Sequence, residues 1–531
     1  MTQGRLKYFG WGREGEGLTT VEEADLLARY RRLFGVNEFA ETPAPPLAAL
    51  RLRPPRLAPP ACLAETCSSE TYDRLAHTYG KSYCDYVRGL AGDYGNAPDL
   101  VAYPRDEAEV AAVVDWAGGE QAAIVPFGGG SSVVGGVEAR LDGGYKAAIS
   151  LDLRHLGRVV EVDRASRAAR IEAGAFGPAL EAQLKPHGLT LRHFPQSFEY
   201  STLGGWIATR SGGHFATLYT HIDDLVESLR IVTPQGTVET RRLPGSGAGP
   251  SPDRLFIGSE GILGVITEAW MRLQDRPRFR AGGAIRFADF YMAARGVRAL
   301  AQAGLYPANC RILDPQEAHN TGAGDGSHAV MVLAFESGDH PVEPWMRRAL
   351  ECVADHGGSP EQADAADAHR EGAAGAWRHA FIRMPYAREP LVQRAIIADT
   401  FETAITWERF EAFHDRIKAA TEAAIRAATG HAGQVTCRFT HAYPDGPAPY
   451  FTFHALGRQG QLVEQWRAIK QAASDALIAA GGTITHHHAV GRDHRPWYDK
   501  QRPDLFATAL RAAKHALDPQ GLFNPGVLID P

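Results

Sequence analysis

Apolar and polar residues alternate with two different rhythms along the chain. Between residues 95 and 278 the apolar runs are short and predict strands over 100–104, 122–125 and 147–153, hairpins over 158–173 and 225–240, and helices over 106–116 and 177–187. From residue 279 to 475 the elements are longer, with strands over 281–287 and 329–335 and helices over 290–303, 343–356 and 407–428. Because the short elements lack a regular strand–helix–strand repeat, the pattern predicts an α+β fold.

The two ends of the chain have patterns of their own. A helix is expected over 21–34, a proline-rich strap over 41–60, a helical stretch over 68–90 and a closing helix over 502–517. Residues 362–375 are rich in Ala, Asp and Gly, which predicts an exposed or mobile stretch.

Composition limits the classes of protein that this chain can belong to. Its 531 residues exceed what one hydrophobic core usually supports, so we expect two or three domains. A net charge of −6 argues against nucleic-acid binding, and the 6 scattered cysteines indicate reduced thiols. The sequence has neither a signal-peptide pattern nor an apolar stretch long enough to span a membrane, so we expect a cytoplasmic protein.

Three segments rich in glycine and hydroxyl residues are candidates for ligand binding. Glycine lets backbone N–H groups approach a ligand closely, and successive N–H groups form a concave anion site that suits a pyrophosphate. Three such loops within one region predict a single extended ligand with a pyrophosphate centre. The residues expected to hold it are Pro126, Phe127, Gly128, Gly129, Gly130, Ser131, Ser132, Gln196, Ser197, Ser201, Thr202, Thr209, Arg210, Ser211, Glu260, Gly261, Gly264, Val265 and Ile266.

Three adjacent histidines, His486, His487 and His488, are the most unusual cluster further along the chain. In an extended segment, alternation would place His486 and His488 on one face and His487 on the other. Consecutive ligands fit a tetrahedral metal site poorly, so we expect no metal. A structural cluster is one alternative, and we favour a place beside the ligand, where imidazoles bind phosphate or transfer protons.

The loops, with Gly-Ser-Glu-Gly-Ile-Leu-Gly-Val-Ile-Thr-Glu at 258–268, resemble the FAD-binding fold of the vanillyl-alcohol-oxidase type flavoproteins. Within that superfamily the chain is similar to the alkyldihydroxyacetonephosphate synthase family. The motifs that carry this similarity are Gly-Trp-Gly at 10–12, Ser-Thr-x-Gly-Gly-Trp at 201–206, Arg-Ile-Leu-Asp at 311–314, Asp-Thr-Phe-Glu-Thr at 399–403, Tyr-Phe-Thr-Phe at 450–453 and His-His-His-Ala-Val-Gly at 486–491. The similarity covers nearly the whole chain beyond the strap.

The resemblance implies an α+β protein with a two-subdomain FAD-binding domain of the PCMH type and an α/β cap with an antiparallel sheet and flanking helices. We expect a helical region and strap over 1–94, the FAD-binding domain over 95–278, the cap over 279–475 and a C-terminal segment over 476–531. Covalent attachment in this superfamily uses a His or Cys, and the loop at 126–132 has neither, so we expect noncovalent FAD.

The implied reaction exchanges the acyl chain of acyl-dihydroxyacetone phosphate for a long-chain alcohol while flavin N5 holds the remainder, which leads to ether lipids. The resemblance makes Tyr450 the proton shuttle, whereas the nearby Tyr443 is a tyrosine that could be mistaken for it. It also places Arg311 in the substrate site, where a guanidinium matches phosphate geometry. His487 or His488 would assist Tyr450. Phe401, Trp407, Phe410 and Phe413 either line a tunnel for the chains or belong to an ordinary core.

Two other functions stay open. The tail Asn524-Pro525-Gly526 is typical of FAD-linked oxidases rather than of the synthases, which favours an oxidase or dehydrogenase of a hydroxy acid or alcohol. A flavin-binding protein without catalysis is disfavoured because Arg311, Tyr450 and the histidines occur together. We also expect a homodimer with peripheral membrane contact.

Overall fold

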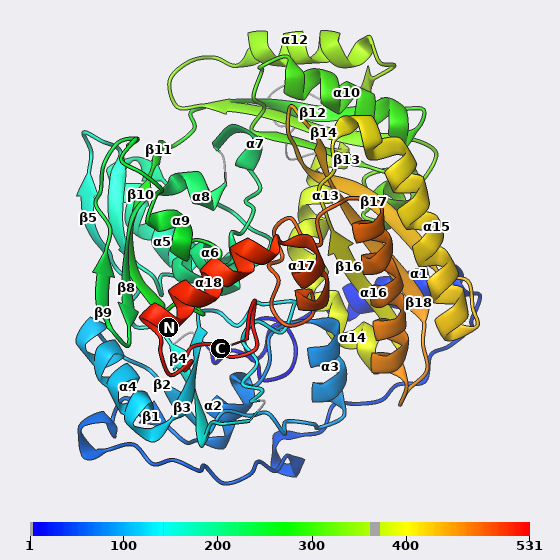
Figure 1. The fold of residues 1–531 in the computed structure, drawn as a ribbon. Coiled ribbons are helices and arrows are strands. Elements are labelled where there is room, and N and C mark those ends of the chain that lie inside the picture. Colours follow the sequence, from blue (N-terminus) through cyan, green and yellow to red (C-terminus); the bar gives the residue numbers. More distant parts are fainter. Residues whose placement is uncertain (1–3, 142, 220, 362–371, 531) are drawn as a thin grey trace.

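The computed structural model describes residues 4–141, 143–219, 221–361 and 372–530. They form a mixed α and β protein in which two smaller sheets lie to the left and bottom of Figure 1 and a large helix-covered sheet lies to the upper right. The α+β prediction is therefore confirmed. Most of the stretch predicted over 362–375 lies outside the described residues, and its last four residues open α13 (Gly372–Arg383), where Ala373 and Ala374 are buried rather than exposed.

The first small sheet delivers the glycine loop that follows residue 125. Its strands, in the order β1-β2-β4-β3, are β1 (Cys67–Ser68), β2 (Leu100–Ala102), β4 (Ala147–Asp152) and β3 (Ala122–Phe127). The last three are parallel. Between β2 and β3 runs α4 (Glu107–Glu120), which begins where the side chain of Asp106 accepts a hydrogen bond from the N–H of Glu109. Both faces of β3 and β4 are buried, as expected for parallel strands.

The second small sheet is antiparallel. Its order is β5-β6-β10-β8-β9, from β5 (Val159–Asp163), β6 (Ala168–Glu172), β10 (Val265–Arg272), β8 (Val226–Thr233) and β9 (Gly236–Glu239). The helices of this region are α5 (Gly177–Leu184), α6 (Leu203–Thr209), α7 (Ala216–Tyr219), α8 (Ile222–Leu225) and α9 (Asp253–Phe256), and β7 (Leu189–Thr190) pairs with β11 (Gln274–Asp275). Both sheets share one hydrophobic core.

The cap is built on a single antiparallel sheet in the order β15-β12-β14-β13-β17-β18-β16. Its strands are β12 (Phe279–Phe287), β13 (Asn309–Leu313), β14 (Ala329–Ser337), β15 (Ser359–Pro360), β16 (Ile396–Glu402), β17 (Gln434–Ala442) and β18 (Pro447–Leu456). Its helices are α10 (Phe290–Gln302), α11 (Pro315–Asn320), α12 (Glu343–Ala354), α13, α14 (Arg388–Gln393), α15 (Phe410–Thr429) and α16 (Leu462–Ala479).

One face of the cap sheet is mainly apolar, and the other carries a second apolar cluster against α13 beside a polar strip. Phe451 and Phe453 of β18 pack in the same core as Phe410 and Ile417 of α15, and α10, α12 and α16 also contribute to that core. Because successive side chains of a strand point to opposite faces, Tyr450 and its alternate neighbours point away from these helices. The fold therefore turns a polar strip of the sheet toward the glycine loops.

Both ends of the described chain fasten distant regions together. The Glu16 carboxylate, just before α1 (Thr20–Phe34), accepts hydrogen bonds from the hydroxyls of Tyr200 in the FAD-binding half and Tyr386 in the cap. After α17 (Arg495–Gln501) and α18 (Asp504–Leu517), the tail runs beside β3: the N–H of Ile124 donates to the carbonyl of Leu522, and the N–H of Asn524 donates back to the carbonyl of Ile124, both at 2.8 Å. The tail therefore forms a parallel bridge with β3 at the edge of the first sheet.

One predicted element is wrong, because the helical stretch over 68–90 is two helices. These are α2 (Thr71–Ala76) and α3 (Tyr83–Leu90), and Ser82 caps the second through a reciprocal pair of hydrogen bonds with Asp85. The break lets the backbone pass the first glycine loop, since a Cβ on Gly80 would lie 2.3 Å from the carbonyl oxygen of Ser132. Strand β1, from the region 1–94, pairs with β2, from the region 95–278. The predicted domain boundaries stay predictions.

Candidate active site

A large cavity lies where the three glycine-rich loops meet the polar face of the cap sheet. It is lined from the first loop through Phe127 and Gly129, from the cap through Arg311 and Tyr450, and from the C-terminal segment through His487. Every residue predicted to hold the extended ligand lines this cavity except Arg210. The structure thus brings together groups that are far apart in the sequence.

Glycine is required where the loops pack against one another. A Cβ on Gly129 would lie 1.8 Å from the carbonyl oxygen of Tyr200, and one on Gly128 would lie 2.3 Å from Oγ1 of Thr202. Gly261 has a φ of +76°, and a Cβ there would lie 2.9 Å from Pro126. A side chain at any of these positions would push the loops apart, so the close backbone cradle depends on glycine.

Arg210 does not line the cavity. It ends α6 in the left-handed conformation with a φ of 52°, and its guanidinium forms an ion pair with Asp223 at 2.7 Å. Its side chain is 64% exposed. The position next to Thr209 and Ser211 suggested a ligand contact, but the helix end turns the side chain outward.

The polar face of the cap sheet supplies the other wall. Residues spaced two apart on neighbouring strands share this face, as strand geometry requires. Those that line the cavity are Arg311 of β13, Ala398 and Thr400 of β16, Arg438 and Thr440 of β17, and Tyr450, Thr452 and His454 of β18. By contrast, Phe401, Phe410 and Phe413 lie in the core on the helix side of the sheet and do not line the cavity, so for them the core interpretation holds.

Arg311 is a buried cation with unused donors. It is 3% exposed, and its Nε and Nη1 have no hydrogen-bond partner among the described residues. Its guanidinium lies 5.1 Å from the centre of the Phe381 ring. Burial, and then the like charge of Arg438, lower the pKa of Arg311 to about 9. Buried charges are normally paired, so an anion in the cavity is the chemical partner that these free donors suit.

Tyr450 lies between Arg438 and the histidines. Its hydroxyl donates to Oγ1 of Thr400 at 3.0 Å, and the guanidinium of Arg438 lies 3.9 Å from the centre of its ring. The ring of His487 stacks at 6.0 Å. Burial raises the pKa of Tyr450, while the cation of Arg438 opposes that rise. The hydroxyl is therefore protonated at neutral pH and can donate or relay a proton.

The three histidines form a turn around Glu402. The buried carboxylate accepts the backbone N–H groups of His486 at 2.7 Å, His487 at 3.1 Å and His488 at 3.0 Å, together with the hydroxyl of Thr485. Nδ1 of His487 lies 3.2 Å from the same carboxylate. The predicted alternation of the side chains is wrong because the segment is a turn rather than a strand, and the reason is this one acceptor.

The carboxylate stays ionised although it is buried. Burial alone would raise the pKa of Glu402, but attraction to His487 and the hydrogen bond from its ring hold that pKa well below its usual value. The surrounding rings behave in the opposite way: burial lowers the pKa of both His486 and His488 to about 3. The neutral imidazoles of His486 and His488 therefore lie beside a fixed negative charge.

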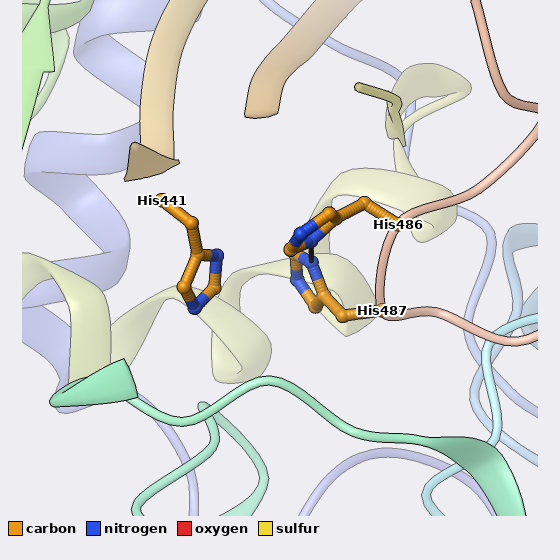
Figure 2. Close-up of side chains that lie close together, drawn as sticks. All are labelled: His441, His486 and His487. Atoms are coloured by element: carbon orange, nitrogen blue, oxygen red, sulfur yellow. Dashed lines mark hydrogen bonds between the residues drawn. The ribbon is translucent and has the colours of Figure 1, made fainter. Parts of the chain in front are cut away.

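His486 lies behind the cavity wall, whereas His487 and His488 line it. Nδ1 of His486 is 3.1 Å from Nδ1 of His487, and its Nε2 is 2.7 Å from the hydroxyl of Tyr443, which also contacts Nε2 of His221. Tyr443 is thus the tyrosine that hydrogen-bonds to the histidine turn, whereas Tyr450 contacts it through its ring. His441, at the end of β17, completes the cluster (Figure 2).

Several residues of this site were not predicted from the sequence: Thr400, Glu402, Arg438 and His441. The available signal is a spacing of two in β17, where Thr436, Arg438 and Thr440 alternate with apolar residues, and a weaker one in β16, where Thr400 and Glu402 flank Phe401. Polar residues that alternate with buried apolar ones mark a strand with one polar face.

The cradle fits FAD. Three loops meet at one cavity where several of their glycines leave no room for a Cβ, hydroxyl groups of Ser131, Ser132 and Thr202 line it, and residues of the cap sheet line it as well. The backbone can therefore approach a pyrophosphate closely. Pro126–Ser132 has no nucleophilic side chain other than its serine hydroxyls, in keeping with a noncovalent cofactor.

Comparisons with known proteins agree with this geometry. A family described as "FAD binding domain" matches residues 98–241, and "FAD linked oxidases, C-terminal domain" matches residues 276–528. Alkyldihydroxyacetonephosphate synthase of Dictyostelium discoideum is 29% identical over 527 residues, covering 92% of this chain and 84% of that protein. The predictions of FAD as cofactor and of a likeness to this group of proteins are confirmed.

One solved structure and one oxidase subunit extend the comparison. A structure of alkyldihydroxyacetonephosphate synthase superposes with a TM-score of 0.80 at 26% identity and covers 98% of both chains. Glycolate oxidase subunit GlcD of Bacillus subtilis is 26% identical over 454 residues, covering 83% of this chain and 91% of that protein. The chain is therefore similar both to a synthase and to an oxidase subunit, so the fold alone does not fix the activity and the residues of the site have to be considered.

Proposed function

Because models of FAD-binding and FAD-linked-oxidase domains match residues 98–241 and 276–528 and the chain resembles the alkyldihydroxyacetonephosphate synthases over nearly its whole length, we propose that it is an FAD-dependent transferase of that kind. Its reaction replaces the acyl chain of acyl-dihydroxyacetone phosphate with a long-chain alcohol and releases a fatty acid. FAD, held by the three loops, supplies the electrophilic and electron-accepting chemistry that amino-acid side chains lack.

The observation that carries this proposal is the buried, unpaired Arg311. A phosphate offers the negative charge and the acceptor oxygens that the Nε and Nη1 donors of Arg311 lack among the described residues. Arg438 lies close enough to depress the pKa of Arg311, and Glu317 pairs with Arg438 at 2.5 Å, so within the described part of the chain no ion pair is formed by Arg311. A dianionic substrate would stabilise both guanidinium groups.

Tyr450 is the group that we propose moves the proton at the substrate carbon. Its hydroxyl lies on the same face of the cap sheet as Arg311 and Arg438, so a substrate held by its phosphate reaches it. Thr400 accepts the hydrogen bond of the resting hydroxyl, and the cation of Arg438 stabilises a phenolate when the proton leaves. His487, next to the ring, accepts or returns that proton, and His488, whose pKa burial lowers to about 3, stays neutral beside it.

The oxidase reading rests on the tail Asn524-Pro525-Gly526, and the contacts of that tail weaken it. The side chain of Asn524 donates to the carbonyls of Gly136 at 3.0 Å and Glu260 at 2.7 Å, both in the FAD-binding half. The tail therefore serves the cofactor cradle that both activities share. It does not bear on which substrate enters.

Anaerobic mixing of the purified holoenzyme with candidate substrates tests the proposal. We expect acyl-dihydroxyacetone phosphate to bleach the flavin absorbance and release a stoichiometric fatty acid, and we expect glycolate, lactate and free alcohols to leave the absorbance unchanged. Tyr450→Phe should bind FAD and substrate but bleach slowly. Bleaching by a hydroxy acid with formation of the oxo acid would overturn the transferase in favour of the oxidase.

We further propose where in the cell the protein works and how it assembles. Lipid substrates favour the predicted peripheral contact with a membrane, and the homodimer and the cytoplasmic location stay predictions. Within the described ranges, none of the helices combines the length and the apolar character that a membrane crossing needs.

A further inference from the structure

Three imidazole rings meet beside the cavity although they come from two distant segments. His441 ends β17, and His486 and His487 belong to the turn around Glu402 (Figure 2). One nitrogen of each ring lies within 4.8 Å of those of the other two. Four-coordinate zinc with Zn–N bonds of 2.0–2.1 Å separates its ligand atoms by about 3.3 Å. The rings therefore need to close by at most about 1.5 Å, which small side-chain rotations supply.

The chemistry of these rings suits a metal ion. An imidazole has two ring nitrogens, and in the neutral ring one of them carries a lone pair. A neutral imidazole is a ligand for Zn²⁺, Ni²⁺, Cu²⁺ and Co²⁺, whereas a protonated one is not.

Each ring also has a polar partner that restricts its orientation. The Gly213 carbonyl lies 3.1 Å from Nε2 of His441, the Tyr443 hydroxyl lies 2.7 Å from Nε2 of His486, and the Glu402 carboxylate lies 3.2 Å from Nδ1 of His487. Partners of this kind fix ring orientation around metals and strengthen binding. The charge of Glu402, buried a few ångströms away, offsets part of the charge of a divalent ion.

The ligand set is open on one side. His441 and His487 line the cavity, so an ion held by the three rings would have its fourth position facing the space beside Tyr450. Three protein ligands and one open position is the arrangement that leaves room for water or for a substrate oxygen.

We propose that His441, His486 and His487 form a binding site for one divalent transition-metal ion, with Zn²⁺ as its representative. The occupied site closes the wall of the cavity next to Tyr450 and ties up His487, so the ion inhibits the reaction carried out there. The binding itself does not depend on which reaction that is, and only the inhibition rests on the proposed function.

Titration of the FAD-loaded protein with Zn²⁺, followed by calorimetry, tests the site directly. We expect one ion per chain, and Co²⁺ should give the visible absorption bands of a tetrahedral nitrogen site. His441→Gln should weaken Zn²⁺ binding by about tenfold or more. The matched control is His454→Gln, because His454 is also buried and lines the same cavity but does not belong to the cluster.

The flavin spectrum of each variant reports whether the cradle is intact. Should His441→Gln lose FAD, His486→Gln provides the same test, since that ring lies behind the cavity wall. Stoichiometric Zn²⁺ binding that both cluster variants retain would overturn the proposal, as would equal weakening by His454→Gln or the absence of binding to the wild type. Tight binding without any effect on catalysis would overturn the inhibitory part alone.

Discussion

Replacing Glu402 by Gln should loosen the histidine turn by a measurable amount. One carboxylate oxygen accepts the N–H of His486 and the other accepts that of His488, and both contact the N–H of His487. An amide keeps a single acceptor oxygen, so in either orientation at least one backbone N–H loses its partner. An orphaned buried donor costs about 1–3 kcal/mol. Opening of the turn should therefore become about five- to 150-fold more frequent.

Hydrogen–deuterium exchange followed by mass spectrometry measures this opening in the FAD-loaded protein. Peptides that contain His486–His488 should exchange faster in Glu402→Gln by that factor, while peptides of α16 keep their wild-type rates. The pKa of Glu402 is held well below its usual value, so its stabilisation is present above a pH of about 4.3 and is lost as the pH falls through the folded-state pKa. The difference between variant and wild type should consequently shrink in acid.

Glu408→Gln is the matched control, because Glu408 is an exposed carboxylate that follows β16 a short distance along the chain. Surface substitutions of this kind change stability by less than about 0.5 kcal/mol, so exchange of the turn should not change. Unaltered exchange of the His486–His488 peptides in Glu402→Gln at neutral pH would refute the view that this carboxylate holds the turn.

Three other predictions concern the cradle, the anion site and the buried histidines. Gly129→Ala should abolish FAD absorbance in the purified protein, since its Cβ would lie 1.8 Å from the Tyr200 carbonyl oxygen; retained FAD would show that the loops can separate. Arg311→Met should raise the thermal midpoint of the substrate-free holoenzyme, because it removes a buried, unpaired cation, yet eliminate bleaching by acyl-dihydroxyacetone phosphate; a lower midpoint would mean that the cation is paired. Burial lowers the pKa of His454 to about 3, so below a pH of about 6.5 the unfolded chain binds a proton there that the folded protein does not. The free energy of unfolding therefore falls by up to about 1.4 kcal/mol per pH unit below that pH. Thermal midpoints measured from pH 7 to pH 4 should therefore fall less steeply for His454→Gln, and parallel curves would contradict the assignment.

Local patterns in the sequence predicted the elements that depend on neighbours along the chain. Short apolar runs gave β3 and β4, and Asp106 marked the start of α4 because an acidic cap acts within its own helix turn. The glycine loops were recognisable because a close backbone approach leaves no other residue type available. FAD and the fold were therefore predictable, and the comparisons confirm both.

The polar face of the cap sheet that lines the cavity was harder to predict because it depends on pairing between distant strands. Arg311 and Arg438 become neighbours only through the order β14-β13-β17-β18 of the cap sheet, which no local pattern specifies. The shape of the histidine turn likewise depends on Glu402, which comes from another strand. A period of two would have found the polar face of β16 and β17, but not the partners of the residues on it. The roles assigned to Arg311, Tyr450 and the histidines stay predictions.

The pairing of β3 with the tail has a consequence for how the protein matures in the cell. Synthesis proceeds from the N-terminus, so Ile124 emerges from the ribosome long before Leu522 and Asn524, the residues that complete its hydrogen bonds. Asn524 also holds Gly136 and Glu260, which flank two of the three loops. A nascent chain therefore contains all three loops before Asn524, whose hydrogen bonds connect two of them, has been synthesised. Cofactor capture then becomes a late event, and flavin fluorescence during translation would report the moment at which the last residues dock.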